Sequence, residues 1–274
     1  MFLQVLAYEL RYRFRLVSTW IYIILAFVVA FLIANLSGGA FDGFEIQAGK
    51  GGEFTFVNNP LNISTFILMM MYLCTIIFAA IFGSSSVRDY ETGSYELFFT
   101  KPVNPKTYFL GRFSGSYLSA LAVVISIVLG LAIGFQMPYL SAYKVGPFLP
   151  LAYLHVLFYF AIPNLFVMGM LFFSVGILSR RVINSYVAGI CVFFAYILAG
   201  MLAGDVEKLT QAAILDPLGM STIAVVTRYW TSAQSNSSYL SLNGLIGWNR
   251  LLWLGISILL MLYSLYKFRS SVDC

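Results

Sequence analysis

The chain has 274 residues, of which 60% are hydrophobic and only 10% are charged, and its formal net charge is +5. Soluble domains carry about 25% charged residues, so this composition excludes a soluble fold and predicts an integral membrane protein. The basic residues are scattered along the chain beside apolar runs, which is typical of membrane orientation and gives no support to nucleic-acid binding.

The N-terminal stretch MFLQVLAYELRYRFR, within residues 1–16, has a helical period. One face carries the apolar side chains Leu3, Leu6, Leu10 and Phe14, and another carries Gln4, Tyr8, Arg11 and Arg15. We expect an amphipathic helix along the inner membrane surface, with its arginines at anionic lipid headgroups. The alternative is a frayed cytoplasmic tail.

Six apolar runs are long enough to span a membrane, which takes about 20 residues. They are residues 17–36, 63–83, 114–135, 151–178, 185–204 and 250–268. Each should be helical, because lipid offers the backbone no hydrogen-bond partner. The first run exceeds the apolar core of about 7–15 residues that a signal peptide has, so we interpret it as a retained helix. The sequence therefore predicts an all-α polytopic membrane protein, with residues 1–274 in a single transmembrane domain.

Residues 37–62 form a Gly-rich outer segment, and residues 136–150 form a short link that contains proline. The outer segment 205–249 is longer and partly apolar, and Pro217 and Gly219 break it into two pieces beside Asp216. We interpret these pieces as short helices that dip into the outer membrane face or lie on it.

The segment 84–113, between the second and third runs, is unusually charged and aromatic. In VRDYETGSYELFFTKPVNPKTYFLGRF the preceding serines suggest the cap of a short helix, Pro102 ends it, and KTYFLGRF restarts a helix. Aromatic anchors among charges are typical of a protein interface, so we expect partner docking, with packing on the membrane surface as the alternative. The candidate docking residues are Arg88, Asp89, Tyr90, Glu91, Gly93, Tyr95, Glu96, Leu97, Phe98, Lys101 and Pro102.

The positive-inside rule gives the orientation. With the N-terminus in the cytoplasm, 11 of the 16 lysines and arginines fall in inner segments and 5 in outer segments. Both termini should therefore be cytoplasmic, and the segment 84–113 should face the cytosol.

Several kinds of chemistry find no support in the sequence. The stretch GFEIQAGKGG has the wrong spacing for a phosphate-binding loop, and Gly rather than Ser or Thr follows Lys50. His155 is the only histidine, so it cannot build a metal site alone. Acidic and basic residues are missing from the middle of each apolar run, which argues against an ion-coupled carrier. We expect no catalytic site, no metal and no cofactor on this chain.

The segment 87–113 resembles the cytosolic loop of ABC-2-type ABC transporter permeases. The matching features are Asp89 and Glu91, Gly93, Glu96-Leu97, Pro102 and the closing Gly111-Arg112, where the family commonly has Lys in place of Arg. The resemblance implies that this loop contains a coupling helix that docks into a groove of a cytosolic ABC ATPase subunit. It also implies a transport subunit without its own ATPase site, with ATP and Mg bound by the partner.

The same resemblance implies a dimer of two permease subunits in a bacterial inner membrane, with export as the usual direction. Small residues in the third and fourth runs favour close helix packing, either inside one subunit or at the dimer seam; they are Gly115, Ser119, Gly169, Ser174 and Gly176.

The C-terminal stretches LDPLGMSTIAVVTRYWT and LIGWNRLLWLG resemble a narrower group, the membrane part of bacterial permeases fused to an M1-type aminopeptidase, although nothing peptidase-like is present. Two other classes remain as alternatives for the whole chain. One is a non-transporting membrane anchor that recruits a cytosolic partner, and the other is an ion-coupled carrier.

Overall fold

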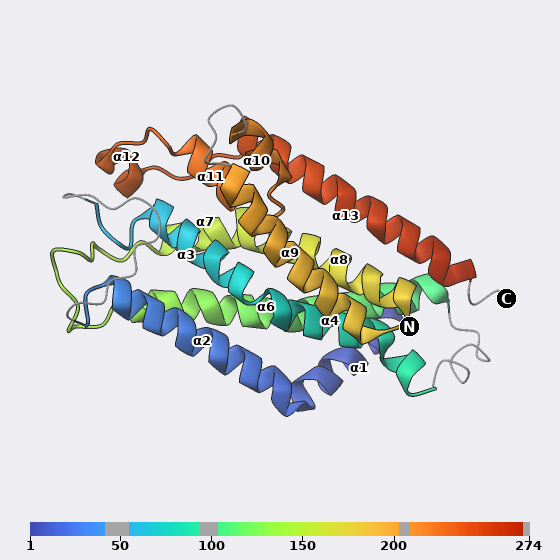
Figure 1. Ribbon diagram of the computed structural model, residues 1–274. Helices are drawn as coiled ribbons and strands as arrows, with labels where there is room; N and C mark the ends of the chain where they lie inside the picture. Colours follow the sequence, from blue (N-terminus) through green and yellow to red (C-terminus); the bar gives the residue numbers. More distant parts are fainter. Residues whose placement is uncertain (42–54, 94–103, 203–208, 271–274) are drawn as a thin grey trace.

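The computed structural model describes residues 1–41, 55–93, 104–202 and 209–270. Every regular element in these ranges is a helix, packed in a bundle of long helices (Figure 1). The all-α prediction is therefore confirmed.

The chain begins with two helices that meet at a sharp corner. α1 (Phe2–Arg15) and α2 (Val17–Ser37) are separated by Leu16, whose backbone is extended at φ −76° and ψ 128°. Arg13 and Arg15 occupy the last turn of α1, where basic side chains interact favourably with the helix dipole. The corner lets α1 fold back against the bundle instead of continuing α2 (Figure 1).

The second apolar run is a broken helix. α3 (Pro60–Leu73) begins at Asn59, whose side chain accepts a hydrogen bond from Asn62 N, and α4 (Thr75–Glu91) follows after Cys74 at an angle of 52°. The expected helix start at the serines was wrong: Ser84 lies inside α4, and its hydroxyl donates to Ala80 O at 2.6 Å. Such back-bonding lets a serine sit in a helix without capping it.

The third and fourth runs form the longest helices. α6 (Pro105–Gly134) begins at Asn104, whose side chain caps Lys106 N, as expected for the helix that KTYFLGRF restarts. α7 (Pro150–Val156), the π-turn η1 (Leu157–Ala161) and α8 (Ile162–Ser179) run on as one helix. Phe113 of α6 stacks with Phe82 of α4 and lies edge-on to Phe173 of α8, which ties three helices together.

The outer segment contains short helices, in agreement with the sequence interpretation. α10 (Leu209–Leu215) and α11 (Met220–Val226) lie on either side of the expected break, and α12 (Ser232–Ser237) follows. α9 (Val182–Leu202) precedes them and α13 (Leu245–Ser270) ends the bundle. Pro217 and Gly219 lie in the turn between α10 and α11, where Gly219 adopts a φ of +78°.

All six predicted runs fall on helices as far as the structure describes them, and residues 203 and 204 of the fifth run lie outside the described residues. Four helices of the described residues meet the length and composition, and the bent pair α3–α4 makes a fifth. The apolar part of α9, Val182–Leu198, is shorter. The described structure thus supports a polytopic protein with four or five spans, and the sixth stays a prediction.

One end of the bundle collects the segments assigned to the cytosol. The N-terminus, the end of α4, the start of α6 and the end of α13 all lie there (Figure 1). The short helices α10, α11 and α12 lie at the opposite end (Figure 1). This arrangement agrees with the expectation that both termini share a side.

Candidate functional site

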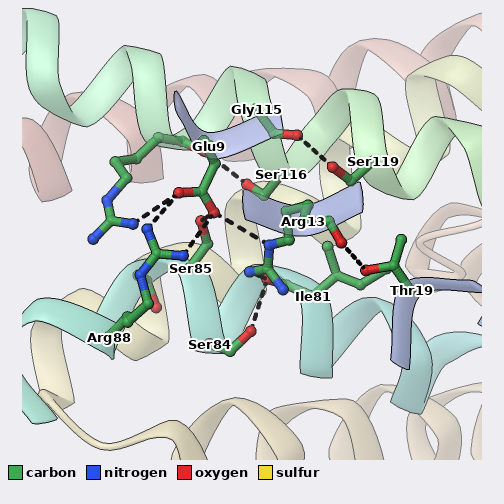
Figure 2. A network of polar contacts seen from close by, with 12 residues as sticks. Glu9, Arg13, Thr19, Ile81, Ser84, Ser85, Arg88, Gly115, Ser116 and Ser119 are labelled. Carbon is green, nitrogen blue, oxygen red and sulfur yellow. Dashed lines mark hydrogen bonds and ion pairs between the residues drawn. The ribbon is translucent and has the colours of Figure 1, made fainter. Parts of the chain in front are cut away.

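A carboxylate on α1 lies at the centre of a buried network of arginines. Glu9 is fully buried; its Oε1 accepts from Arg13 Nε at 3.2 Å and Ser85 Oγ at 2.6 Å, and its Oε2 accepts from Arg88 Nη2 at 2.7 Å and Arg112 Nη1 at 2.8 Å. Figure 2 shows the Glu9 side chain reaching from α1 to meet donors from α4. We call Glu9, Arg13, Ser85, Arg88, Asp89 and Arg112 the Glu9 network.

The network joins three segments far apart in sequence. Arg13 belongs to α1, Arg88 to the last turn of α4, and Arg112 to the second turn of α6. Arg112 also forms an ion pair through Nη2 with Asp89 of α4. α4, which ends before residues 94–103, and α6, which begins after them, are therefore bound to each other and to α1.

Charge balance makes the network sensitive to any single change. Three guanidinium groups face the two carboxylates of Glu9 and Asp89, and the side chains of Arg13 and Arg112 are at most 6% exposed. Burial lowers the pKa of Arg13, and the neighbouring Glu9 carboxylate opposes that shift. Removing one partner of a buried ion pair costs about 3–5 kcal/mol, so Glu9 is needed to keep these arginines buried.

Glycines on α6 allow α1 to approach closely. A Cβ atom on Gly115 would lie 2.6 Å from Cβ of Glu9, and one on Gly111 would lie 2.8 Å from Cβ of Val5. The sequence singled out Gly115 as a packing residue without deciding its partner. In the structure its partner is α1 of the same chain.

Arg88 is also held by aromatic rings of α1. Its Cζ lies 3.9 Å from the ring centroid of Tyr12 and 5.9 Å from that of Tyr8. A guanidinium over an aromatic face contributes about 0.5–2 kcal/mol, more when desolvated. α1 therefore holds Arg88 by a carboxylate and by aromatic faces.

A groove of about 350 Å³ opens beside the network, between α1, the end of α4 and the start of α6. Its walls are Met1, Gln4, Val5, Tyr8, Asp89, Tyr108 and Arg112. Asp89 near the end of α4 and Tyr108 near the start of α6 both line the groove, so it lies close to the described residues on either side of 94–103.

The structure brings together only part of the expected docking set. Arg88 and Asp89 belong to the Glu9 network. The Cζ atom of Arg180 lies over the ring of Tyr90, 5.1 Å from the ring centroid. Glu91 is exposed, and Gly93 has a φ of +67°. Six of the candidate residues lie outside the described residues: Tyr95, Glu96, Leu97, Phe98, Lys101 and Pro102.

The amphipathic helix differs from its expected role in one respect. Tyr8, Arg11 and Arg15 are exposed, which suits a helix at a membrane surface. Arg13 is instead buried against Glu9 and Ile81 O. The expectation that all the arginines of this helix meet lipid headgroups was therefore wrong for Arg13.

The outer segment contains a second buried polar cluster, around Asp216. The Asp216 carboxylate accepts from Tyr72 Oη and from the backbone N–H groups of Leu218 at 3.0 Å, Gly219 at 3.1 Å and Ser221 at 2.6 Å. The sequence singled out Asp216, Pro217 and Gly219, and the structure shows that the carboxylate closes the turn they form.

Two residues of α13 and one of α8 support this turn from the other side. Asn249 Nδ2 donates to Asp216 O at 2.9 Å, Arg250 Nη1 donates to Asn164 Oδ1, and Asn164 Nδ2 donates to Leu218 O at 2.9 Å. Sequence reasoning missed all three residues. The only available signal was the polar pair Asn249-Arg250 at the start of an apolar run.

The described residues offer no cluster of side chains suited to a metal ion. There, histidine, cysteine and acidic side chains form no group of three or more that could hold a metal ion. The Glu9 carboxylate is occupied by arginines and a serine hydroxyl. The chemistry of this site is thus ion pairing between helices.

Comparison with known protein families gives one match. The family model described as ABC-2 family transporter protein matches residues 3–270. No curated protein matches the chain. The family match does not bear on the narrower resemblance of the C-terminal part to permeases fused to an aminopeptidase.

Proposed function

This chain belongs to the ABC-2 family of transporter proteins, and from that premise we propose that it is driven by a cytosolic ATPase that docks on the segment 91–101 beside the Glu9 network. As a member of the family it is a multi-pass transmembrane subunit of an ABC transporter, and the family works with ABC ATPase subunits. Members normally lack an ATPase site of their own.

The Glu9 network is the observation that carries this proposal. A docked ATPase pushes on residues 91–101. The network binds α4, which leads into this segment, and α6, which follows it, to α1. Ion pairs between α1, α4 and α6 make these three segments move as one block. The spans α2 and α6 continue from this block into the membrane, so its movement becomes a tilt of the spans.

We further propose that two such subunits, identical or homologous, form the pathway along their interface in a bacterial inner membrane. Both termini then face the cytosol, which the shared end of the bundle supports (Figure 1). Export is the direction we expect from the family. ATP and Mg are bound by the ATPase subunit and not by this chain.

Affinity purification of the full chain from its native membrane tests the first step. We expect a co-purified ATPase with a phosphate-binding loop. An enzyme without such a loop, recovered in its place, would support the alternative of a membrane anchor. Transport that continues with a catalytically dead ATPase would support an ion-coupled carrier.

Substitution of the docking segment tests the second step. Glu96→Ala and Phe98→Ala should lower the amount of ATPase recovered with the chain, because an anchoring aromatic residue and its neighbouring charge carry much of the binding energy of an interface. Tyr143→Ala is the matched control, since Tyr143 is 95% exposed and lies in the link 136–150 on the opposite side. Unchanged recovery for Glu96→Ala and Phe98→Ala would refute the docking assignment.

A further inference from the structure

A buried hydrogen bond connects the outer segment to the second span. Tyr72 of α3 donates from Oη to Asp216 Oδ1, between residues 144 positions apart, and both residues are at most 3% exposed. The Tyr72 ring also stacks on Tyr196 of α9, with 4.1 Å between ring centroids. Tyr72 is thus held between α9 and the turn that Asp216 closes.

The turn around Asp216 is built to move as a unit. The carboxylate binds three backbone N–H groups of residues 218–221, and the Asp216 carbonyl accepts from Asn249 Nδ2. A pull on the carboxylate therefore acts on the whole turn. The turn lies between α10 and α11, so both short helices follow it.

Tyr72 occupies a particular place on the second span. It is the residue before the last of α3, and the 52° break at Cys74 follows directly. α4 then runs without interruption to Arg88 and Asp89 in the Glu9 network. At 1.5 Å per residue, α4 carries a displacement over about 20 Å from the network to the break.

We propose that the Tyr72–Asp216 hydrogen bond is a positioning contact that passes movement of α3–α4 from the Glu9 network to α10, α11 and the turn between them. The proposal rests on the proposed function in one respect, that an ATPase moves the network in the working transporter. The coupling itself is a property of this chain. Helices are stiff, and the turn around Asp216 is held by several hydrogen bonds. The hydrogen bond between Tyr72 and Asp216 therefore decides whether the turn moves when α3 moves.

The thiol of Cys191 can be used to follow the position of the turn around Asp216. Cys191 of α9 is exposed and lines an apolar groove of about 330 Å³ together with Leu215 and Pro217, which flank Asp216. A displacement of the turn changes the access of a small reagent to the Cys191 thiol. Cys74 is buried and reports whether the bundle stays folded.

The experiment is a double-mutant cycle between the two ends of the bundle, with the rate of N-ethylmaleimide labelling at Cys191 as the readout. Arg88→Gln perturbs the network, and Tyr72→Phe removes only the hydroxyl that binds Asp216. Mass spectrometry of the separate peptides follows Cys191 and Cys74 in the purified full chain. Asp216→Asn is a second way to weaken the contact, because it removes the negative charge and leaves one acceptor oxygen for Tyr72 Oη and the three backbone N–H groups.

We expect Arg88→Gln to change the Cys191 labelling rate by about twofold or more in the native background, which is the change that coupling at the low end of the usual range gives. In the Tyr72→Phe and Asp216→Asn backgrounds the same substitution should have no effect beyond error. A purely structural hydrogen bond would give additive effects instead, so the same fold-change in all backgrounds overturns the proposal. No change at Cys191 in the native background also overturns it.

Tyr153→Phe is the matched control for the loss of a buried hydroxyl. Tyr153 is 4% exposed, and its hydroxyl has no hydrogen-bond partner among the described residues. The effect of Arg88→Gln should be unchanged in this background. Because the cycle uses neither ATPase nor cargo, a chain that showed the coupling but bound no ATPase would refute the proposed function and leave this contact standing.

Discussion

Arg88 of α4 donates from Nη2 to Glu9 Oε2 of α1 across 2.7 Å, between residues 79 positions apart in the chain. The same guanidinium lies over the ring of Tyr12, also of α1. α1 is thus bound to the helix that leads into the candidate docking segment. Under the proposed function, this contact would pass movement of α4 to α1.

Glu9→Gln should strongly destabilise the fold. The change leaves three guanidinium groups facing the single carboxylate of Asp89, and an uncompensated buried charge costs about 3–5 kcal/mol. The free energy of unfolding, measured by titration with SDS in mixed micelles, should fall by about this amount. Glu91→Gln is the control, because Glu91 is exposed and outside the network, and its effect should stay within about 0.5 kcal/mol. Equal effects of the two substitutions would contradict the assigned role of Glu9.

Gly115→Ala should separate α1 from α6. The added Cβ would lie 2.6 Å from both Cβ and Cγ of Glu9, so the backbone of α1 must shift. Overpacking of this kind costs about 1–3 kcal/mol. Gly255→Ala on α13 adds the same methyl group where no atom lies within 4 Å, and it should cause no loss of stability. The same SDS titration compares the two, and a neutral Gly115→Ala would show that α1 is not packed as described.

The apolar runs predicted the helices well because a physical rule constrains them. Lipid leaves the backbone no hydrogen-bond partner, so each long run had to be helical. The sequence also predicted the turn at Pro217 and Gly219, since proline fixes φ and glycine allows the positive φ that Gly219 adopts. Features that depend on local chemistry, such as these helices and this turn, could therefore be predicted from the sequence.

The Glu9 network was not predicted, because the contacts that join its helices lie between residues 23 to 103 positions apart. On a helical wheel Arg11 and Arg15 share a face and Arg13 lies on nearly the opposite side, but a wheel does not identify the partner that a side chain meets. Only the pair Glu9 and Arg13, four residues apart, hinted at a local ion pair. The serines of α4 led to a wrong prediction of a helix start, since a small polar residue suits both a helix cap and a tightly packed helix interior.

Gly219→Ala should lower the free energy of unfolding by more than the cost of placing alanine at a positive φ. Gly219 and Gly244 both have positive φ, +78° and +64°, and an L-residue in such a conformation costs about 1–2 kcal/mol. A Cβ at Gly219 would also overlap the Arg250 guanidinium, whose Cζ would lie 3.0 Å away, whereas nothing lies within 4 Å at Gly244. Gly244→Ala therefore measures the conformational cost alone.

The difference between these two substitutions isolates the support that Arg250 gives to the turn. We expect Gly219→Ala to lower the free energy of unfolding by about 1–3 kcal/mol more than Gly244→Ala, as overpacking does. The Cys191 labelling rate should also change in Gly219→Ala only, because Cys191 and Pro217 line the same groove. If Gly219→Ala and Gly244→Ala have the same stability and the same labelling rate, the Arg250 side chain shifts to make room for the methyl group without moving the turn.

Arg112→Lys tests whether charge alone holds α6 to the network. Arg112 donates from Nη1 to Glu9 and from Nη2 to Asp89, so one planar guanidinium bridges carboxylates on two helices. The ammonium of lysine is a single point charge and cannot reproduce this two-ended geometry. One of the two carboxylates then loses a charge-assisted hydrogen bond, and the free energy of unfolding should fall by about 1.5–3 kcal/mol. Lys106→Arg, the reverse exchange at an exposed position of α6, should be neutral. If Arg112→Lys is as stable as the native chain, a single positive charge is sufficient between α1 and α4, and the bridging geometry has no part in joining the three helices.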